Sequence, residues 1–304
     1  MLTSLEERRG ELSAIAPRHG DKAPKATGLG NTALSMIALL GCHSRVGDEF
    51  DEQIGRLGRF LLTMMRDDGG FYPAYNLAQG HVIQGPDPLY AGGQAVFALS
   101  LLEAAAEAHP DAPFPPPDEL RDAVERAMNY TATTYWNHGL YDFFFIEENW
   151  HCLAARASLG HHRNDNYERF CLDYITYKSR LMLDEESGVS RDLLGSYGFG
   201  NVIPPHNTPT GGFGETLAAA MELRRARGES LADDQVLMRG VLTFLLRQQW
   251  RPELCFACIA EPAIAGAFSE SMSSPVIRID YVQHSMSALG HGGRLLDLPP
   301  GEPR

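Results

Sequence analysis

The sequence predicts an all-α protein whose helices form an α/α toroid of about five to six helical hairpins. Three observations lead to this fold class: a repeat of about sixty residues, two kinds of helix that alternate within it, and long aromatic loops between them. We expect residues 1–304 to form a single α/α-toroid domain, because no change in composition marks a domain boundary.

The repeat is visible as five similar segments that open with glycine or polar residues and continue with small and apolar residues. A helix that is apolar on nearly every side is buried on all sides. The segments therefore predict five inner helices, and a sixth hairpin would require a weaker first one. They are GLGNTALSMIALLG from Gly28, LYAGGQAVFALSLLEAA from Leu89, EENWHCLAARASLG from Glu147, GGFGETLAAAMEL from Gly211 and IRIDYVQHSMSALG from Ile277.

Helices with only one apolar side lie between these segments. Apolar residues recur at helical spacing within residues 54–64, 120–128 and 236–245, while charged residues occupy the other positions. Such an alternation of buried and one-sided helices is typical of two concentric rings. An open helical solenoid is the alternative, but the first and last buried segments have no polar face to cap its ends. We therefore expect the toroid to be closed.

The loops after the one-sided helices are long and rich in glycine, proline and aromatic residues, as in DDGGFYPAYN from Asp67 and HGLYDFFF from His138. Loops of this length are usually functional or disordered, and disordered segments contain few aromatic residues. Each loop leads into the N-terminal end of an inner helix. The loops should therefore gather at one mouth of the toroid, where we expect a pocket.

Carboxylates and histidines fall at equivalent positions near the starts of the inner helices. We expect Glu148, Glu215 and Asp280 to be the acid–base groups, with His284 assisting them. When two carboxyl groups share one half-buried cleft, the pKa of one is raised above that of the other. The first then acts as an acid and the second as a base. A single carboxylate at a helix start is equally explained as a stabiliser of that helix end, so the hypothesis depends on the whole set.

Polar and aromatic residues complete the predicted site. Aromatic walls suit sugar rings, amides supply neutral hydrogen bonds, and arginines in the mouth loops bind carboxylate or phosphate groups through two parallel bonds. For a lone helical histidine such as His151, a satisfied core position is the simpler explanation. The predicted substrate-binding residues are Asn31, Tyr75, Tyr90, Gln94, Asn149, Trp150, His151, Arg191, Phe213, Arg278 and Tyr281.

The composition limits the partners to a small-molecule or glycan substrate. A formal net charge of −13 disfavours nucleic acid and anionic lipid, because both require a basic surface. No apolar stretch is long enough for a membrane span, and residues 1–20 lack the apolar segment of a signal peptide. Five cysteines in 304 residues favour reduced thiols and a cytoplasmic location.

The sequence motifs predict no cofactor, because nucleotide-binding and hydrolase motifs are missing. Zinc is the alternative. Cys255 and Cys258 have a spacing found in zinc sites, and His151 with Cys152 would complete a ligand set. Cysteines in an apolar run are commonly small buried side chains, so we expect no metal site.

Three segments, which together reach across nearly the whole chain, resemble proteins of the α/α-toroid superfamily. RDDGGFYPAY from Arg66 is similar to the repeats of terpene cyclases and protein prenyltransferases. PLYAGGQAVFALSLL from Pro88 resembles the inner helices of glucuronyl C5-epimerase barrels, and VIRIDYVQHSMSAL from Val276 resembles the last inner helix of six-hairpin glycosidase-like proteins. The DxDD and DDxxD motifs of terpene cyclisation are missing. The resemblance implies an architecture and does not fix a function.

Three functions remain open. The leading hypothesis is an enzyme that acts on a carbohydrate or related bulky substrate by carboxylate acid–base chemistry, as a glycosidase, lyase or epimerase does. The second is a cyclase or transferase for a prenyl, lipid or peptide substrate, with zinc as a possible cofactor. The third is a non-catalytic toroid that binds a ligand and uses its carboxylates only to stabilise helix ends.

Overall fold

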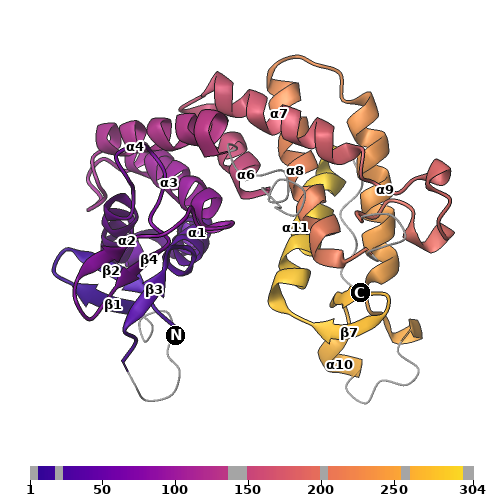
Figure 1. Ribbon diagram of the computed structural model, residues 1–304, viewed down its shortest axis with the longest axis horizontal. Coiled ribbons are helices and arrows are strands. Elements are labelled where there is room, and N and C mark those ends of the chain that lie inside the picture. The colour runs from indigo at the N-terminus through magenta and orange to yellow at the C-terminus, as the bar shows by residue number, and fades with distance from the viewer. Residues whose placement is uncertain (1–5, 18–22, 136–148, 199–204, 255–260, 297–304) are drawn as a thin grey trace. The chain divides into compact units, whose positions relative to one another are not determined.

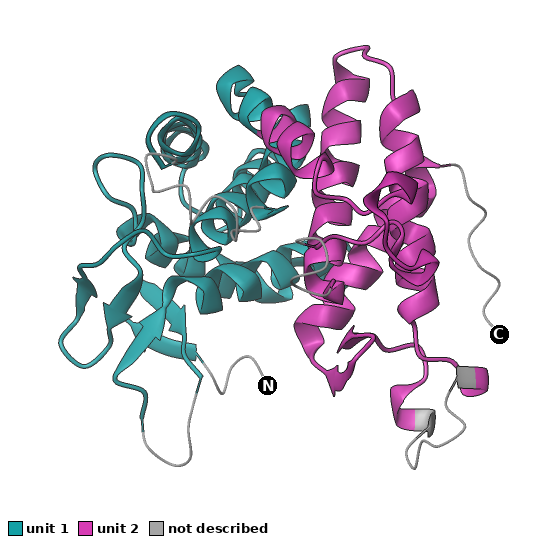
Figure 2. Ribbon diagram, turned by 45° about the vertical axis from the view of Figure 1, so that its right-hand side comes forward, with its two compact units in different colours: residues 1–170 teal, residues 171–304 magenta. Residues whose placement is uncertain are grey.

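The computed structural model describes residues 6–17, 23–135, 149–198, 205–254 and 261–296 (Figure 1). The chain divides into two compact units, residues 1–170 and residues 171–304 (Figure 2). Most described residues are helical. No helix among them is both long and apolar enough to cross a membrane.

Unit 1 contains three of the predicted inner helices. α3 packs against α1 on one side and α6 on the other, while α4 packs on α3 and α2 packs on both α1 and α3. A Cβ atom at Gly93 of α3 would lie 2.9 Å from the Cβ atom of Trp150, so this glycine lets α3 and α6 approach closely. The helices of this unit are α1 (Leu29–Val46), α2 (Asp51–Thr63), α3 (Ala91–Ala108), α4 (Pro117–Tyr130) and α6 (Asn149–Ala157), with short turns η2 (Gly47–Phe50), η3 (Thr131–Tyr135) and η4 (Ser158–Gly160).

Local sequence explains the one-sided helix α4. Pro117 occupies its first turn, where the missing N–H has no intrahelical acceptor, and Asp118 and Glu119 favour the positive end of the helix dipole. Leu120 and Val124 are fully buried, four residues apart on the side that faces α3. The predicted one-sided helix within residues 120–128 is thus confirmed.

Two small antiparallel sheets precede and interrupt the helices of unit 1. One pairs β1 (Glu6–Arg9) with β2 (Leu12–Ile15), and the other has the order β3-β4-β5 (Ala26–Gly28, Ala74–Asn76 and His81–Ile83). Thr27 on β3 connects the two sheets, because its hydroxyl donates a 2.6 Å hydrogen bond to the carbonyl group of Ile15 on β2. Strands of three or four residues are too short for their alternation to be recognised in a sequence, and we did not expect them.

Unit 2 is organised around the pairing of α8 with α11, its most extensive helix contact. Nearly every residue of α8 from Thr210 to Met221 is buried, as the sequence predicts for an inner helix. α9 covers this pair and supplies Val241 and Phe244 to the core. The elements of this unit are the greater part of α7 (Asp165–Ser179), α8 (Asn207–Ala226), α9 (Ala232–Gln248), α10 (Glu261–Ile264), α11 (Ile279–Leu295), the turns η5 (Glu185–Ser187), η6 (Arg191–Leu193) and η7 (Pro252–Leu254), and the hairpin of β6 (Ser269–Ser271) and β7 (Ser274–Ile277).

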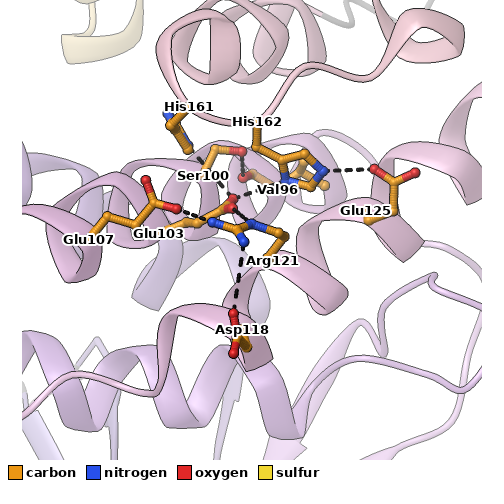
Figure 3. A network of polar contacts seen from close by, with 9 residues as sticks. All are labelled: Val96, Ser100, Glu103, Glu107, Asp118, Arg121, Glu125, His161 and His162. Carbon is orange, nitrogen blue, oxygen red and sulfur yellow. Dashed lines mark hydrogen bonds and ion pairs between the residues drawn. The ribbon is translucent and has the colours of Figure 1, made fainter. Parts of the chain in front are cut away.

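A buried carboxylate joins three segments of unit 1 (Figure 3). The side chain of Glu103 on α3 is fully buried, and His162 Nδ1 lies 3.2 Å from its Oε2 atom. His161 Nε2 lies 3.7 Å from the same oxygen, and Arg121 Nε of α4 lies 3.4 Å from Oε1. His162 Nε2 also lies 2.8 Å from Glu125 of α4. The two histidines therefore tie the segment after η4 to both α3 and α4.

These contacts determine the ionisation of Glu103. Burial alone would raise the pKa of its carboxyl group, but the hydrogen bonds and positive charge of His161 and His162 outweigh that effect. The net pKa lies below the ordinary value of 4.5. Because the folded-state pKa is lowered, the stabilisation is complete above the unfolded-state pKa and is lost as the pH falls through the folded-state pKa.

We predict that Glu103→Gln lowers the free energy of unfolding at pH 7 by about 1–3 kcal/mol, because it leaves buried donors without an ionised acceptor. The difference from the wild type should shrink as the pH falls below 4.5, where the wild-type carboxyl group also becomes protonated. Urea denaturation followed by circular dichroism at neutral and acidic pH measures both values. Glu107→Gln is the control, since Glu107 also pairs with Arg121 but is partly exposed. A difference that stays constant with pH would contradict this account.

Candidate active site

A buried carboxylate–imidazole pair lies at the contact of α8 with α11. Glu215 Oε2 lies 2.7 Å from His284 Nδ1, and the Glu215 side chain is fully buried. The amide of Gln283 donates a 3.0 Å hydrogen bond to the other carboxylate oxygen, Oε1. Two consecutive residues of α11 thus hold both oxygens of one carboxylate on α8. Glu215 and His284 are both catalytic candidates predicted from the sequence, and the structure brings these two together.

Glycines on α8 make this short contact possible. A Cβ atom at Gly211 would lie 2.8 Å from the carbonyl carbon of His284 and 2.8 Å from the amide nitrogen of Ser285. One turn along, a Cβ atom at Gly214 would lie 2.7 Å from the Cβ atom of Ala288. Only residues without side chains let the two backbones approach so closely. The carboxylate of Glu215, one residue later, therefore reaches α11 directly.

The pair has a defined chemistry. An ionised carboxylate only accepts hydrogen bonds, so whenever Glu215 is ionised the proton of the shared bond belongs to Nδ1 of His284. This arrangement fixes one tautomer of the imidazole ring, the one in which Nε2 carries no proton. A carboxylate in this position also stabilises the imidazolium ion that forms when Nε2 takes up a proton.

Asp280 is the other carboxylate candidate that the structure describes, and its contacts are separate from those of this pair. Asp280 accepts a 3.0 Å hydrogen bond from Arg278 Nε at the start of α11, and its side chain is 34% exposed. The Arg278 guanidinium also lies 5.1 Å from the ring centre of Tyr281. Tyr281 in turn donates a 3.2 Å hydrogen bond to Glu270 of β6. These three predicted residues therefore form one ion-pair and aromatic cluster at the start of α11.

Two more predicted residues belong to unit 2. Phe213 is buried and stacks on Tyr197, with the ring centres 4.3 Å apart. Arg191 begins the exposed turn η6, and its carbonyl group accepts a 3.1 Å hydrogen bond from Arg247. Phe213 thus contributes to the packing two residues from Glu215, while Arg191 lies on the surface.

In unit 1 the segment from Asn149 to His151 is buried at the start of α6. His151 Nδ1 lies 2.6 Å from the hydroxyl oxygen of Tyr167, and its ring contacts Tyr135 and Phe170. Burial lowers the pKa of His151 to about 3. His151 is therefore neutral at physiological pH, in agreement with the simpler core explanation.

The remaining predicted residues lie near the starts of α1 and α3 or on a strand. Asn31 donates a 3.2 Å hydrogen bond to the hydroxyl of Thr27, and Gln94 packs against Gly30. Tyr75 on β4 is buried edge-on against Phe60. Tyr90 immediately precedes α3 with a φ of 61°, which a residue with a side chain seldom adopts. Such backbone strain is commonly found near functional sites.

A polar cluster that the sequence analysis missed lies near the same helix start. Arg66 NH1 lies 2.7 Å from Asp87 Oδ1, and the hydroxyl of Tyr130 donates a 2.6 Å hydrogen bond to Asp87 Oδ2. Burial, and then Asp87, raise the pKa of Tyr130 to about 12. Asp87 and Tyr130 line a cavity of about 20 Å³ together with His151. The charged pair was not recognised because its members come from separate loops.

Some predicted residues lie outside the described part of the chain, namely Glu148, Cys255 and Cys258. Cys152 and Cys171 are disulfide-bonded, so the expectation of reduced thiols is wrong for these two. Cys152 is therefore not available as a thiolate ligand in the zinc alternative. Within the described ranges, no three histidine, cysteine or acidic side chains are grouped as a metal site requires.

No protein-family profile matches the sequence, and no curated protein matches it significantly. Solved structures do match. Cellobiose 2-epimerase from Spirochaeta thermophila aligns with a TM-score of 0.63 at 14% identity, over 97% of this chain and 77% of that chain. D-mannose isomerase aligns with a TM-score of 0.55 at 15% identity, over 90% of this chain and 73% of that chain.

A third solved structure is matched over a smaller share of both chains. Cellobiose 2-epimerase from Bacillus thermoamylovorans aligns with a TM-score of 0.50 at 14% identity, over 74% of this chain but only 61% of that chain. These similarities establish the fold. The chain has the α/α-toroid fold, which confirms the predicted fold class. At such low identity the activity must be argued from the chemistry of the site.

We predict that Gly211→Ala lowers the free energy of unfolding by about 1–3 kcal/mol, because the new methyl group would overlap backbone atoms of α11 that cannot turn away. Gly290→Ala is the matched control, since a Cβ atom at this position of α11 meets no atom within 4 Å. The control should be neutral or slightly stabilising. Urea denaturation of both variants compares them. Equal effects would show that the close approach of α8 to α11 is not a constraint.

Proposed function

We propose that this protein is a carbohydrate-acting enzyme of the epimerase or isomerase type. In this proposal His284 transfers a proton, and Glu215 orients the imidazole ring and stabilises its protonated form. The observation that carries this proposal is the 2.7 Å contact between a fully buried carboxylate and an imidazole on neighbouring helices. Buried carboxylate–imidazole pairs are a common means of preparing a histidine for proton transfer.

The known structures with the same fold support the choice of substrate. Their names describe a 2-epimerase of cellobiose and an isomerase of D-mannose. Both reactions change the configuration or oxidation level at carbon 2 of an aldose, next to the carbonyl carbon. Each therefore requires removal and return of a proton beside a carbonyl group, which is the task that a general base performs.

The reaction we propose starts from the open-chain aldose. Nε2 of His284 takes the proton from carbon 2, the C2–H bond breaks, and its electron pair moves toward the carbonyl oxygen to give an enediolate. Delivery of a proton to the opposite face of carbon 2, by an acid group on that face, yields the epimer. Return of the proton from His284 to carbon 1, with transfer of the hydroxyl proton from O2 to O1, yields the ketose. Glu215 stabilises the imidazolium while it carries the proton. No oxidant or reductant is consumed.

The contacts of Glu215 favour this chemistry over glycoside hydrolysis. Hydrolysis of a glycosidic bond commonly uses two carboxyl groups about 5–9.5 Å apart. In the described part of the chain, Glu215 contacts an imidazole and an amide, and Asp280 is paired with Arg278. A role for Glu148 beside Glu215 stays a prediction, as does catalysis by Asp280.

The test is solvent exchange at carbon 2. Purified protein is incubated with mannose, glucose or cellobiose in D₂O, and proton NMR follows the loss of the H2 signal and the formation of the epimer or ketose. We expect wild-type protein to exchange this proton. His284→Gln should slow exchange by about 10²–10⁴-fold, the usual contribution of a general base. Glu215→Gln should slow it as well, because the imidazole loses its orienting charge.

Glu229→Gln is the control variant, since Glu229 lies beyond the C-terminal end of α8 and pairs with Arg227 rather than with the buried pair. It should retain most of the exchange rate. Unchanged circular dichroism spectra must accompany the loss of activity in the other two variants. Full exchange by His284→Gln, or no exchange by the wild-type protein with any of the three sugars, would refute the proposed function.

A further inference from the structure

A hollow in unit 2 lies between the end of α9 and the β6–β7 hairpin. Its volume is about 380 Å³, and it is lined by residues 247–250, Ser269 and residues 271–275. Small-molecule sites typically measure about 300–1,000 Å³. The hollow is therefore large enough for a sugar ring and its substituents.

The walls of this hollow are polar but almost uncharged. Arg247 is the one charged residue among the described residues that line it, in a chain with a net charge of −13. Serine hydroxyls and glutamine amides supply most of the other polar groups, and both groups donate as well as accept hydrogen bonds. Such a surface suits a neutral ligand with many hydroxyl groups better than an ion.

Trp250 adds an aromatic surface to this wall. Its side chain is partly exposed, whereas its Nε1 atom is buried and has no hydrogen-bond partner among the described residues. A buried indole N–H usually has an acceptor. A hydroxyl-rich ligand offers both an acceptor for this donor and an apolar ring face to cover the indole.

The hairpin is fastened to the two helices that carry the buried pair. Asn207, in the first turn of α8, donates a 2.6 Å hydrogen bond to the carbonyl group of Ser269. Tyr281, in the first turn of α11, contacts Glu270 through its hydroxyl group. Asn207 is itself fully buried, and its Oδ1 atom lacks a partner within the described part of the chain. The hollow and the Glu215–His284 pair are thus linked through the same two helices.

We propose that this hollow is a subsite for a neutral sugar ring, so that the enzyme accepts a disaccharide or longer glycan rather than a monosaccharide alone. Trp250 covers one face of the ring, and the serines and glutamines bind its hydroxyl groups. The assignment of a second ring rests on the proposed function, because the first ring reacts at His284. The binding of a sugar at the hollow does not depend on it.

Binding is tested by proton–nitrogen NMR of the three tryptophan indoles in the full chain, titrated with cellobiose. Trp250→Phe identifies the signal of Trp250. We expect that signal to shift with cellobiose, and Ser273→Phe, which places a ring in the mouth of the hollow, to weaken binding at least tenfold. Val276→Phe is the matched control, because Val276 is exposed on the same hairpin and does not line the hollow.

The two proposals fail in different ways. If Trp250 responds and Ser273→Phe weakens the response, the subsite stands even when no sugar exchanges its H2 proton. If the enzyme is active, Ser273→Phe should raise KM for cellobiose while leaving kcat, and the KM for mannose, unchanged. An indole signal that does not shift, or that shifts equally in Ser273→Phe and the wild type, would overturn the subsite whatever the activity.

Discussion

The close packing of α8 on α11 is the constraint on which the candidate site depends. Without the glycines at positions 211 and 214, the two backbones could not approach closely enough for Glu215 to reach His284. The same approach removes Glu215 from water, which is costly for an ionised carboxylate unless it is paired and hydrogen-bonded. Gln283 and His284 meet that requirement from one turn of one helix. Packing and chemistry are therefore two consequences of the same contact.

Unit 1 also contains a buried carboxylate that is paired with histidine side chains. Glu103 is also a fully buried carboxylate on an inner helix, and histidines from a distant part of the sequence hold it. There, however, Arg121 joins the histidines, and the network connects three segments near the end of α3 (Figure 3). A buried charge whose partners come from several elements resists change, because removing one partner leaves the others unsatisfied. We therefore interpret Glu103 as structural, whereas the catalytic role of Glu215 is a proposal.

In α1 and α11 the expected burial on all sides is wrong, since Leu34, Ile279 and Met286 are exposed. For α3, α6 and α8 the sequence was sufficient to predict it, because burial on all sides leaves an apolar composition that can be read directly. It also singled out Glu215 and His284, yet not their pairing, since 69 residues separate them and no local pattern connects them. The glycines of GGFGE were a signal of close approach that could have been used. The Arg66–Asp87 pair and the short strands depend on contacts between loops, which periodicity does not report. The disulfide-bonded state of Cys152 and Cys171 corrected an inference that rested on cysteine number alone.

The most direct test of this account is the tautomer of His284, observed by nitrogen-15 NMR of the imidazole rings, with His284→Gln to assign the signals. If Glu215 orients the ring, Nδ1 carries the proton in the neutral wild-type side chain, and this preference is reduced or lost in Glu215→Gln. A ring protonated at Nε2, or a tautomer that does not change when Glu215 is replaced, would show that the carboxylate does not prepare His284 for proton transfer.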